Sequence, residues 1–289
     1  MSAPDGLLVV DKPAGWTSHD VVGRTRRLAR TRKVGHAGTL DPMATGVLLL
    51  GIGKATRLLG HLALTDKVYD ATIRLGQTTV TDDAEGDVVQ TRDASQVSDA
   101  QISAQIALLT GDLQQVPSSV SAIKVDGVRS YARVRAGEQV ELKARSVTVS
   151  RFQLLHRHGD DLEVTVECTS GTYIRALARD LGGALGVGGH LTALRRTRVG
   201  PFGLDVARTL EQLEEGFDDA VLGLDEAVAI SFPRRELDSE EALALSFGKK
   251  LSATGRVGVV GAFDLEGRCV ALVEDREDGA RPSVVFLPA

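Results

Sequence analysis

The most informative stretch of this sequence is Gly35-His36-Ala37-Gly38-Thr39-Leu40-Asp41-Pro42-Met43-Ala44-Thr45-Gly46, followed at once by the apolar run Val47-Leu48-Leu49-Leu50. Glycine adopts backbone angles that other residues avoid and lets another molecule approach closely. The proline biases the aspartate before it toward an extended or turn conformation. One acid presented on such a loop, against a buried strand, is typical of an active site. A polar turn between two elements is the alternative interpretation.

Apolar stretches on either side of this loop predict buried strands at residues 6–11 and 45–51. Ser18 is placed to cap a helix over residues 19–32, where apolar positions recur at helical spacing and arginines occupy the other face. Residues 54–64 are predicted to form a second helix. The glycine-rich loop therefore follows a helix and leads into a buried strand.

Further along the chain, strands and helices mix without regular alternation. Residues 68–75 alternate as a strand does, and residues 145–155 and 161–169 are typical of an antiparallel pair. The polar, acidic stretch 78–99 is expected on the surface, and residues 172–185 form an amphipathic helix. This mixture favours an α+β fold over a doubly wound parallel sheet.

The composition changes after about residue 228. A short helix and short strand-like stretches follow, which predicts a small β-rich C-terminal domain. We therefore expect a larger domain over residues 1–228 and a smaller one over residues 229–289. The loose segment of residues 117–146 is typical of an arm inserted between sheet elements.

Bulk composition indicates a large globular chain. It has 289 residues, of which 43% are apolar and 25% charged, so it can bury a sizeable core. No stretch reaches the ~20 apolar residues that a membrane helix needs. The residues before the first strand lack the charged-then-apolar pattern of a secretory signal. We expect a cytoplasmic protein.

Charge is distributed unevenly along the chain. The net charge is −5, yet six of the ten residues from Arg24 to Lys33 are Lys or Arg, and Arg195-Arg196-Thr197-Arg198 is a second basic cluster. Local basic patches govern polyanion binding more than the whole-chain sum does. A solvated helix face or strand end is the alternative interpretation of each cluster, so charge alone leaves nucleic-acid binding open.

The motifs of nucleotide-triphosphate binding and of serine hydrolases are not present. Gly53-Lys54 resembles the end of a phosphate loop, but Leu48 stands where the first glycine is required, and Ala55 follows the lysine. No G-x-S-x-G elbow occurs, so a serine hydrolase is unsupported.

Metal and disulfide chemistry are also unsupported. His36, Asp41 and His61 do not have the spacing of metal ligands on a helix. Cys168 and Cys269 lie far apart and form no CxxC pair, so both are expected to be buried structural thiols.

The segment Gly171-Thr172-Tyr173-Ile174-Arg175 lies where a strand gives way to a helix. One interpretation is a helix cap followed by a surface arginine. The other is an ion pair between Arg175 and a buried carboxylate such as Asp41, because the planar guanidinium suits such pairing. Tyr69 also has two interpretations: it is either an ordinary strand residue or a ring that stacks on a base.

Distinctive motifs follow one another in a fixed order: Asp11-Lys12-Pro13-x-Gly15, the Gly35–Gly46 segment, Asp66-Lys67-x-Tyr69, Gly171-Thr172-Tyr173-Ile174-Arg175, and His190-Leu191-x-x-Leu194-Arg195-Arg196. Together they resemble the TruB family of pseudouridine synthases, the bacterial tRNA pseudouridine-55 synthases. The resemblance covers residues 6 to about 210 and, more weakly, the C-terminal part. Val80 departs from it, because the family often carries an aspartate there.

This resemblance implies a pseudouridine-synthase fold, with a mixed, largely antiparallel central sheet flanked by helices, a thumb arm at about 117–146 and a small C-terminal PUA-like domain. It implies isomerisation of uridine 55 in the T-loop of tRNA, in which the N-glycosidic bond breaks, the uracil turns and a carbon–carbon bond forms. No cofactor and no metal are implied. The implied partner is the T-arm stem-loop of tRNA, bound by a monomer without an obligate protein partner or a membrane.

The resemblance also implies residue roles. Asp41 matches the catalytic aspartate, and whether it attacks the sugar or removes its 2′ proton stays open. Tyr69 matches the residue that stacks on the flipped-out base. Tyr173 matches a tyrosine proposed to assist proton removal, and Arg175 matches the partner of the aspartate. The substrate-binding residues that it implies are Lys12, His36 and Leu194.

Two other functions compete with this one. A tRNA-binding folding factor without catalysis would keep the RNA contacts, and a folding role could also accompany catalysis. A glycoside hydrolase normally needs two facing carboxylates, and no second acid has a sequence context comparable with that of Asp41.

Overall fold

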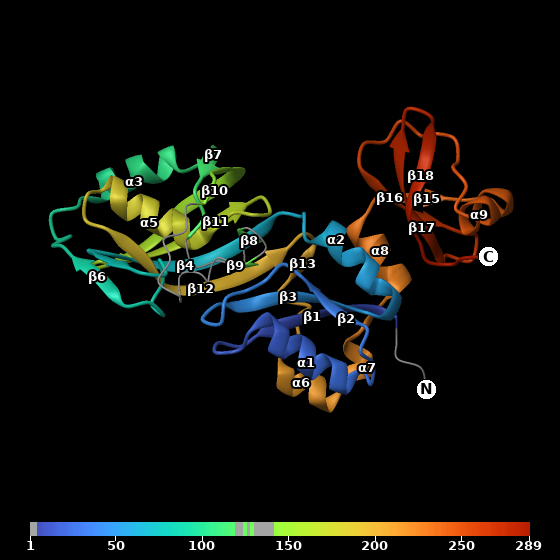
Figure 1. Cartoon of the computed structure of the whole chain (residues 1–289), viewed down its shortest axis with the longest axis horizontal. Helices are drawn as coiled ribbons and strands as arrows, with labels where there is room; N and C mark the ends of the chain where they lie inside the picture. The colour runs from blue at the N-terminus through green and yellow to red at the C-terminus, as the bar shows by residue number, and fades with distance from the viewer. Residues whose placement is uncertain (1–4, 119–123, 126–127, 130–141) are drawn as a thin grey trace.

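A large mixed β-sheet forms the centre of the molecule (Figure 1). The computed structural model describes residues 5–118, 124–125, 128–129 and 142–289, and the statements below concern those residues. In spatial order the strands are β14 (Leu222–Gly223), β1 (Gly6–Lys12), β3 (Thr45–Ile52), β12 (Gly189–Val199), β4 (Lys67–Leu75), β11 (Asp161–Cys168), β10 (Arg145–His158) and β7 (Gly111–Gln115), with β13 (Phe202–Gly203) on β12 and β2 (Val34–Ala37) on β3. Of the described pairs in this sheet, β3 and β12 run parallel and the others antiparallel. The expected mixed, largely antiparallel sheet is confirmed.

Helices cover both halves of this sheet. Helices α1 (Ser18–Leu28) and α6 (Leu210–Glu215) lie against the half that contains β1 and β3, and the short α7 (Phe217–Ala220) follows them (Figure 1). Helices α3 (Asp99–Leu108) and α5 (Ile174–Ala184) lie over the other half. One apolar core runs through both halves, because Val21 of α1, Leu48 of β3 and Leu177 of α5 belong to the same buried cluster. The sheet and its helices are therefore one α+β unit.

The first helix begins at Ser18, and the prediction that Ser18 caps it was wrong. Thr17 is the cap: its hydroxyl accepts the backbone N–H of Asp20 at 3.1 Å, and the Asp20 carboxylate accepts the N–H of Thr17 at 2.9 Å. This reciprocal pair satisfies two of the free donors at the helix start. The helix ends at Leu28, before the expected residue 32, because the chain turns at Arg30, whose φ is +51°.

Residues 54–64 do not form the single α-helix that was predicted. The chain winds as a 3₁₀ turn, η1 (Gly53–Leu58), and then as the short helix α2 (Leu59–Leu62). Apolar periodicity does not distinguish these two windings over so few residues.

The acidic stretch 78–99 was expected to lie on the surface, but part of it is buried. Strands β5 (Gln77–Thr79) and β6 (Val88–Thr91) pair with each other, and β6 is exposed along its whole length. Between them, however, Asp83 is 2% exposed. It is buried because it lies against a cation from a distant helix, a partner that the local sequence does not reveal.

The C-terminal part forms a second, four-stranded sheet at the end of the molecule remote from α3 and α5 (Figure 1). Its elements are β15 (Arg234–Glu236), α9 (Ser239–Ser246), β16 (Val259–Phe263), β17 (Cys269–Arg276) and β18 (Gly279–Val285). Helix α8 (Leu224–Ser231) leads into it and spans the predicted boundary at 228. Phe263 and Leu272 pack in one apolar cluster with Leu49 of the main sheet, so the two sheets share a core.

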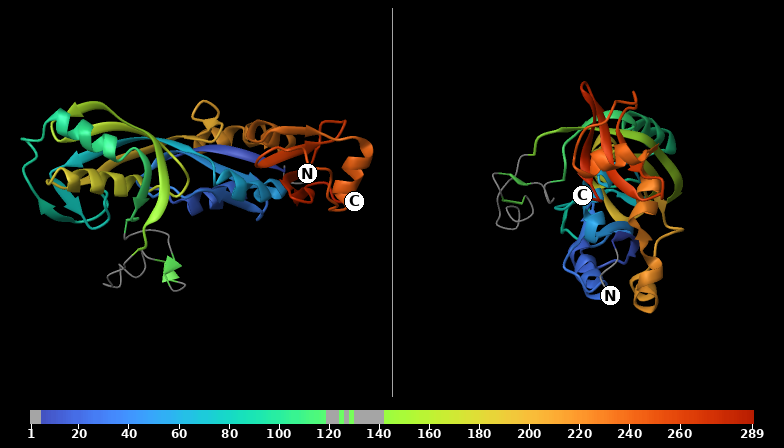
Figure 2. Two further views of the ribbon diagram at one scale, coloured as in Figure 1. Left: turned by 90° about the horizontal axis from the view of Figure 1, so that it is seen from above. Right: turned by 90° about the vertical axis from the view of Figure 1, so that its right-hand side faces the viewer.

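The predicted arm at 117–146 lies largely outside the described residues. Within it, β8 (Lys124–Val125) pairs with β9 (Val128–Arg129), and Figure 2 shows this pair standing off the main sheet. The arm therefore stays a prediction.

Candidate active site

The loop that carries Asp41 joins β2 to β3 and is pinned on both sides of the aspartate. The Ser18 hydroxyl donates to the carbonyl of Leu40 at 3.1 Å and accepts the Leu40 N–H at 2.9 Å. The N–H of Gly15 donates to the carbonyl of Pro42 at 2.8 Å. The backbone around Asp41 is thus held by the β1–α1 connection, while its carboxylate remains 37% exposed.

Lys12 supports the same loop from within the protein. Its ammonium donates to the carbonyls of Pro13 at 2.8 Å, Trp16 at 2.7 Å and Pro42 at 3.2 Å. The side chain is fully buried, and burial lowers the pKa of Lys12 to about 8. The nearby carboxylate of Asp41 has the opposite, smaller effect on this pKa. All three ammonium protons are therefore used to hold backbone.

Arg175, in the first turn of α5, forms the ion pair with Asp41 that the sequence left open. Its Nε lies 3.1 Å from Oδ2 of Asp41, and its side chain is 5% exposed, so the surface-arginine alternative is wrong. Nη1 donates to the carbonyl of Thr81 at 2.8 Å and lies 3.3 Å from Oδ2 of Asp83. One buried guanidinium therefore joins the loop after β5 to the Asp41 loop.

Asp83 was not among the predicted site residues. Its side chain is 3% exposed, and Oδ1 accepts the Thr81 hydroxyl and, at 3.0 Å, the N–H of Glu85. In the sequence it is one of several acids in a polar stretch, and the family resemblance, which extends over Asp82 and Asp83, gave it no role.

A cavity of about 270 Å³ opens beside the Asp41–Arg175 pair. The predicted site residues that line it are Asp41, Tyr69, Tyr173, Arg175 and Leu194. Tyr69 is 7% exposed; burial raises its pKa, and the guanidinium of Arg196 opposes that rise. These five residues come from four separate elements, so tertiary structure alone brings them together.

Tyr173 occupies the cap position of α5 and is fixed through its backbone. Its N–H donates to Oε1 of Gln115 at 2.8 Å, and Nε2 of Gln115 donates to its carbonyl at 3.1 Å. Gln115, at the end of β7, is buried. It is a second residue that the sequence gave no reason to select.

Lys12 and His36 do not line this cavity. Lys12 lies beneath the loop, as described above, and His36 is in β2. The ring of His36 contacts that of His19 edge-on, with the centroids 5.4 Å apart, and burial lowers its pKa. His36 is therefore placed beside the loop and toward α1.

The two basic clusters differ in whether their side chains are free to bind a polyanion. In the second, Arg195 pairs with Asp11 at 2.7 Å, Arg198 pairs with Glu167, and Arg196 is 1% exposed. These arginines are therefore paired or buried within β12, so this cluster is neither a free basic patch nor the solvated strand end of the alternative interpretation. Most of the first cluster, on and after α1, is exposed.

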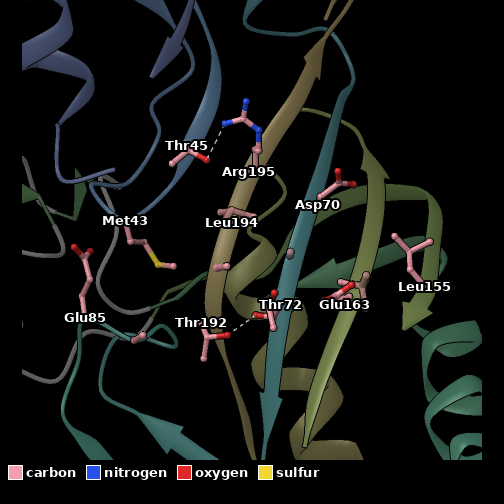
Figure 3. A pocket seen from close by; sticks show the side chains of 14 residues that line it. Met43, Thr45, Asp70, Thr72, Glu85, Leu155, Glu163, Thr192, Leu194 and Arg195 are labelled. Carbon is pink, nitrogen blue, oxygen red and sulfur yellow. Dashed lines mark hydrogen bonds between the residues drawn. The ribbon is translucent and has the colours of Figure 1, made fainter. Parts of the chain in front are cut away.

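A larger groove of about 550 Å³ lies nearby (Figure 3). Asp70 and Thr72 of β4 line it with Glu163 of β11, and Met43 and Glu85 lie across from them. Successive side chains of a strand point to opposite faces, so Asp70 faces away from its neighbour Tyr69. The groove and the cavity beside Asp41 share Leu194.

Both cysteines are buried with free thiols, as expected, and burial raises the pKa of Cys168 to about 11 and of Cys269 to about 12. In the described ranges, no group of three His, Cys, Asp or Glu side chains could hold a metal ion. The helices found there are all too short or too polar to cross a bilayer.

Family models match this chain from residue 26 onward. The TruB family pseudouridylate synthase N-terminal domain matches residues 26–174. The tRNA pseudouridylate synthase B C-terminal domain matches residues 175–229, and the C-terminal model of tRNA pseudouridine synthase II matches residues 232–287.

Curated relatives align over nearly the whole chain. Two proteins named tRNA pseudouridine synthase B are similar to it. The one from Rhodococcus jostii (strain RHA1) is 61% identical over 98% of this chain and 94% of its own. The one from Arthrobacter sp. (strain FB24) is 59% identical over 98% of this chain and 97% of its own.

Solved structures share the fold. A chain of a Cbf5-Nop10-Gar1 complex superposes with a TM-score of 0.78 at 28% identity, covering 100% of this chain and 87% of that one. A chain of an H/ACA RNP bound to a substrate RNA containing 2′-deoxyuridine gives 0.75 at 26% identity, with the same coverage. The family models and the relatives that align over nearly the whole chain agree, and the chain belongs to the TruB family of pseudouridylate synthases.

Proposed function

We propose that this enzyme converts uridine 55 in the T-loop of tRNA to pseudouridine, with Asp41 as its single catalytic carboxylate. The relatives named above support a tRNA substrate. The observation that carries the assignment to Asp41 is its 3.1 Å ion pair with buried Arg175 at a cavity lined by Tyr69 and Tyr173.

The reaction is an isomerisation and needs no oxidant. The bond between N1 of uracil and C1′ of the ribose breaks, and a bond between C5 and C1′ forms. The C5 proton is released, and N1 takes up a proton. Asp41 acts either by attacking the sugar or by removing its 2′ proton. In both cases the charge-assisted contact with Arg175 orients the carboxylate.

The remaining residues hold the base and the loop. Unstacking the target base costs a few kcal/mol, and a ring that stacks on the flipped-out base offsets part of that cost. We assign this role to Tyr69, with Leu194 as an apolar contact and Tyr173 as an aid to proton removal at C5. Lys12 contributes through the loop backbone, because its ammonium is already used there.

RNA docking requires more surface than this cavity. We propose that His36 helps to hold the displaced nucleotides and that an arm at 117–146 closes on the T-arm stem-loop. The C-terminal unit, taken as residues 229–289, is proposed to be a PUA-like RNA-binding domain. The enzyme is proposed to act in the cytoplasm as a monomer, without a cofactor.

The test uses an unmodified tRNA transcript and a second transcript with cytidine in place of uridine 55. We expect the wild-type protein to form pseudouridine in the first transcript alone. Asp41→Asn should form none while it still binds tRNA. Asp70→Asn is the matched control, since this acid lies on the other face of β4, and it should retain activity.

Four outcomes would contradict the proposal. Pseudouridine at another position would exclude uridine 55 as the target. Product from Asp41→Asn would exclude the single-carboxylate mechanism. Release of free uracil would favour a hydrolase, and tRNA binding without product would favour a folding factor.

A further inference from the structure

Arg196, in β12, is the largest fully buried side chain of the described residues, and it lines the active-site cavity. Its Nε donates to the carbonyl of Val47 at 2.7 Å, in β3. Nη2 donates to the carbonyl of Gly38 at 3.1 Å, and Nη1 reaches that of Thr39 at 3.5 Å. One guanidinium therefore connects the strand after the Asp41 loop with the residues just before Asp41.

The charge of Arg196 is balanced differently from the charges of its neighbours. Arg195 and Arg198 are part-exposed, and each pairs with a carboxylate. In the described part of the chain, no carboxylate forms an ion pair with Arg196. A buried cation that is held by backbone carbonyls and by the side chain of Tyr69, without a carboxylate, is costly to the fold, so ordinary strand pairing does not account for an arginine at this position.

Tyr69 lies directly beside this cation. Arg196 and Tyr69 are opposite each other in the β12–β4 register, and both line the cavity. The guanidinium lowers the pKa of Tyr69, against the effect of burial. Arg196 thus contacts both walls of the cavity: the tyrosine wall on β4 and the aspartate loop before β3.

The backbone at this point is also tightly constrained. Arg196 is opposite Gly46 in the parallel β3–β12 pair, and Gly46 has φ of +99°. A Cβ at Gly46 would lie 2.1 Å from the carbonyl oxygen of Arg196. The two strands therefore meet too closely for a side chain between them, and the backbone of Arg196 is held directly against the end of the Asp41 loop.

We infer that Arg196 is a positioning residue for the reaction, which fixes the Asp41 loop relative to Tyr69 through its three carbonyl contacts. This inference rests on the proposed function of Asp41 and Tyr69. The inference goes beyond the proposed function because it names a residue that sets the geometry of the cavity without needing to touch the substrate.

Its test compares Arg196→Lys and Arg196→Met with Arg198→Met. Arg198 is a matched arginine on the same strand, and neither it nor its partner Glu167 lines the cavity. Two quantities are measured at a temperature well below the thermal unfolding midpoint of each variant. They are the single-turnover rate of pseudouridine formation with enzyme in excess, and the Kd for tRNA. A misplaced reacting group costs on the order of 100-fold in rate.

We expect Arg196→Met to lose rate by about 100-fold while its Kd stays within about threefold of the wild-type value. Arg196→Lys keeps the charge but lacks the planar fork, so it should lose about tenfold. Arg198→Met should be unchanged. If Arg196→Met does not fold, Arg196→Lys decides the question.

An active wild-type enzyme whose Arg196→Lys or Arg196→Met variant retains the wild-type rate would overturn the inference. So would a loss of tRNA affinity that accounts for the whole loss of rate. A wild-type protein that forms no pseudouridine contradicts the proposed function instead, so the two failures are distinguishable.

Discussion

The buried carboxylate of Asp83 lies 3.3 Å from Nη1 of Arg175, in the same guanidinium whose Nε contacts Asp41. Arg175 therefore has two acidic partners that differ in exposure: Asp83 is 3% exposed and Asp41 is 37% exposed. The buried acid fixes the arginine, and the arginine in turn orients the acid at the cavity.

Replacing Asp83 by Asn should therefore slow catalysis without direct contact between Asp83 and RNA. Among the described residues, the variant leaves Asp41 as the one acid that forms an ion pair with Arg175, and the guanidinium shifts toward it. We expect the single-turnover rate to fall by about 10- to 100-fold, the cost of a misplaced reacting group. Asp82→Asn is the control, because Asp82 pairs with Arg179 outside the cavity. An Asp83→Asn enzyme as fast as the wild type would show that Arg175 needs no second partner.

Gly46 should tolerate no side chain. A Cβ there meets the carbonyl oxygen of Arg196 at 2.1 Å, and the φ of +99° is strained for any L-residue. We expect Gly46→Ala to lower the free energy of unfolding by at least about 1–3 kcal/mol, the cost of such a backbone conformation alone. Gly23→Ala, in α1 with open space around the new methyl, should instead stabilise by up to about 1 kcal/mol. Urea unfolding of both variants measures this, and equal stabilities would refute it.

The buried Lys12 should make stability depend on pH. Burial lowers its pKa from 10.5 to about 8 in the folded protein. Between these two values, the unfolded chain holds a proton on this lysine that the folded chain has released. Raising the pH through this window therefore favours the folded state. The buried thiols act in the opposite direction, because burial raises their pKa values above the usual 9.

A comparison with Lys12→Met isolates the lysine, because the thiols are the same in both proteins. We expect the unfolding free energy of the wild type, relative to that of the variant, to increase between about pH 8 and about pH 10.5. Urea unfolding at several pH values measures the difference. A difference that stays constant across this range would mean that Lys12 keeps its usual pKa.

The C-terminal sheet should unfold together with the main sheet. Phe263 is fully buried in the cluster that contains Leu49 and Phe202 of the main sheet. Phe263→Ala should lower the unfolding free energy by about 3–5 kcal/mol and keep a single transition. Leu265→Ala is the control, since Leu265 is 77% exposed. A separate early transition in Phe263→Ala would instead show that residues 229–289 are an independent domain.

The sequence by itself determined much of the local structure, and it singled out the loop that carries Asp41. Strand-like stretches near β1, β3, β4 and β11 and the helix near α5 were predicted because their apolar patterns have a clear period. The loop with Asp41 was recognisable because glycine, proline and one acid occur there in a fixed order. The ion pair between Arg175 and Asp41 was anticipated as one of two alternatives, since guanidinium and carboxylate are complementary in shape and charge.

Tertiary structure decided which polar residues belong to the site. Asp83 is in an acidic stretch expected on the surface, yet it is buried because Arg175, 92 positions later in the sequence, lies against it. Arg196 is in a basic cluster, yet it is buried because β12 runs through the middle of the sheet beside β3. A charge pattern gives the number of ions in a segment but not their distant partners, and those partners decide which ions are buried.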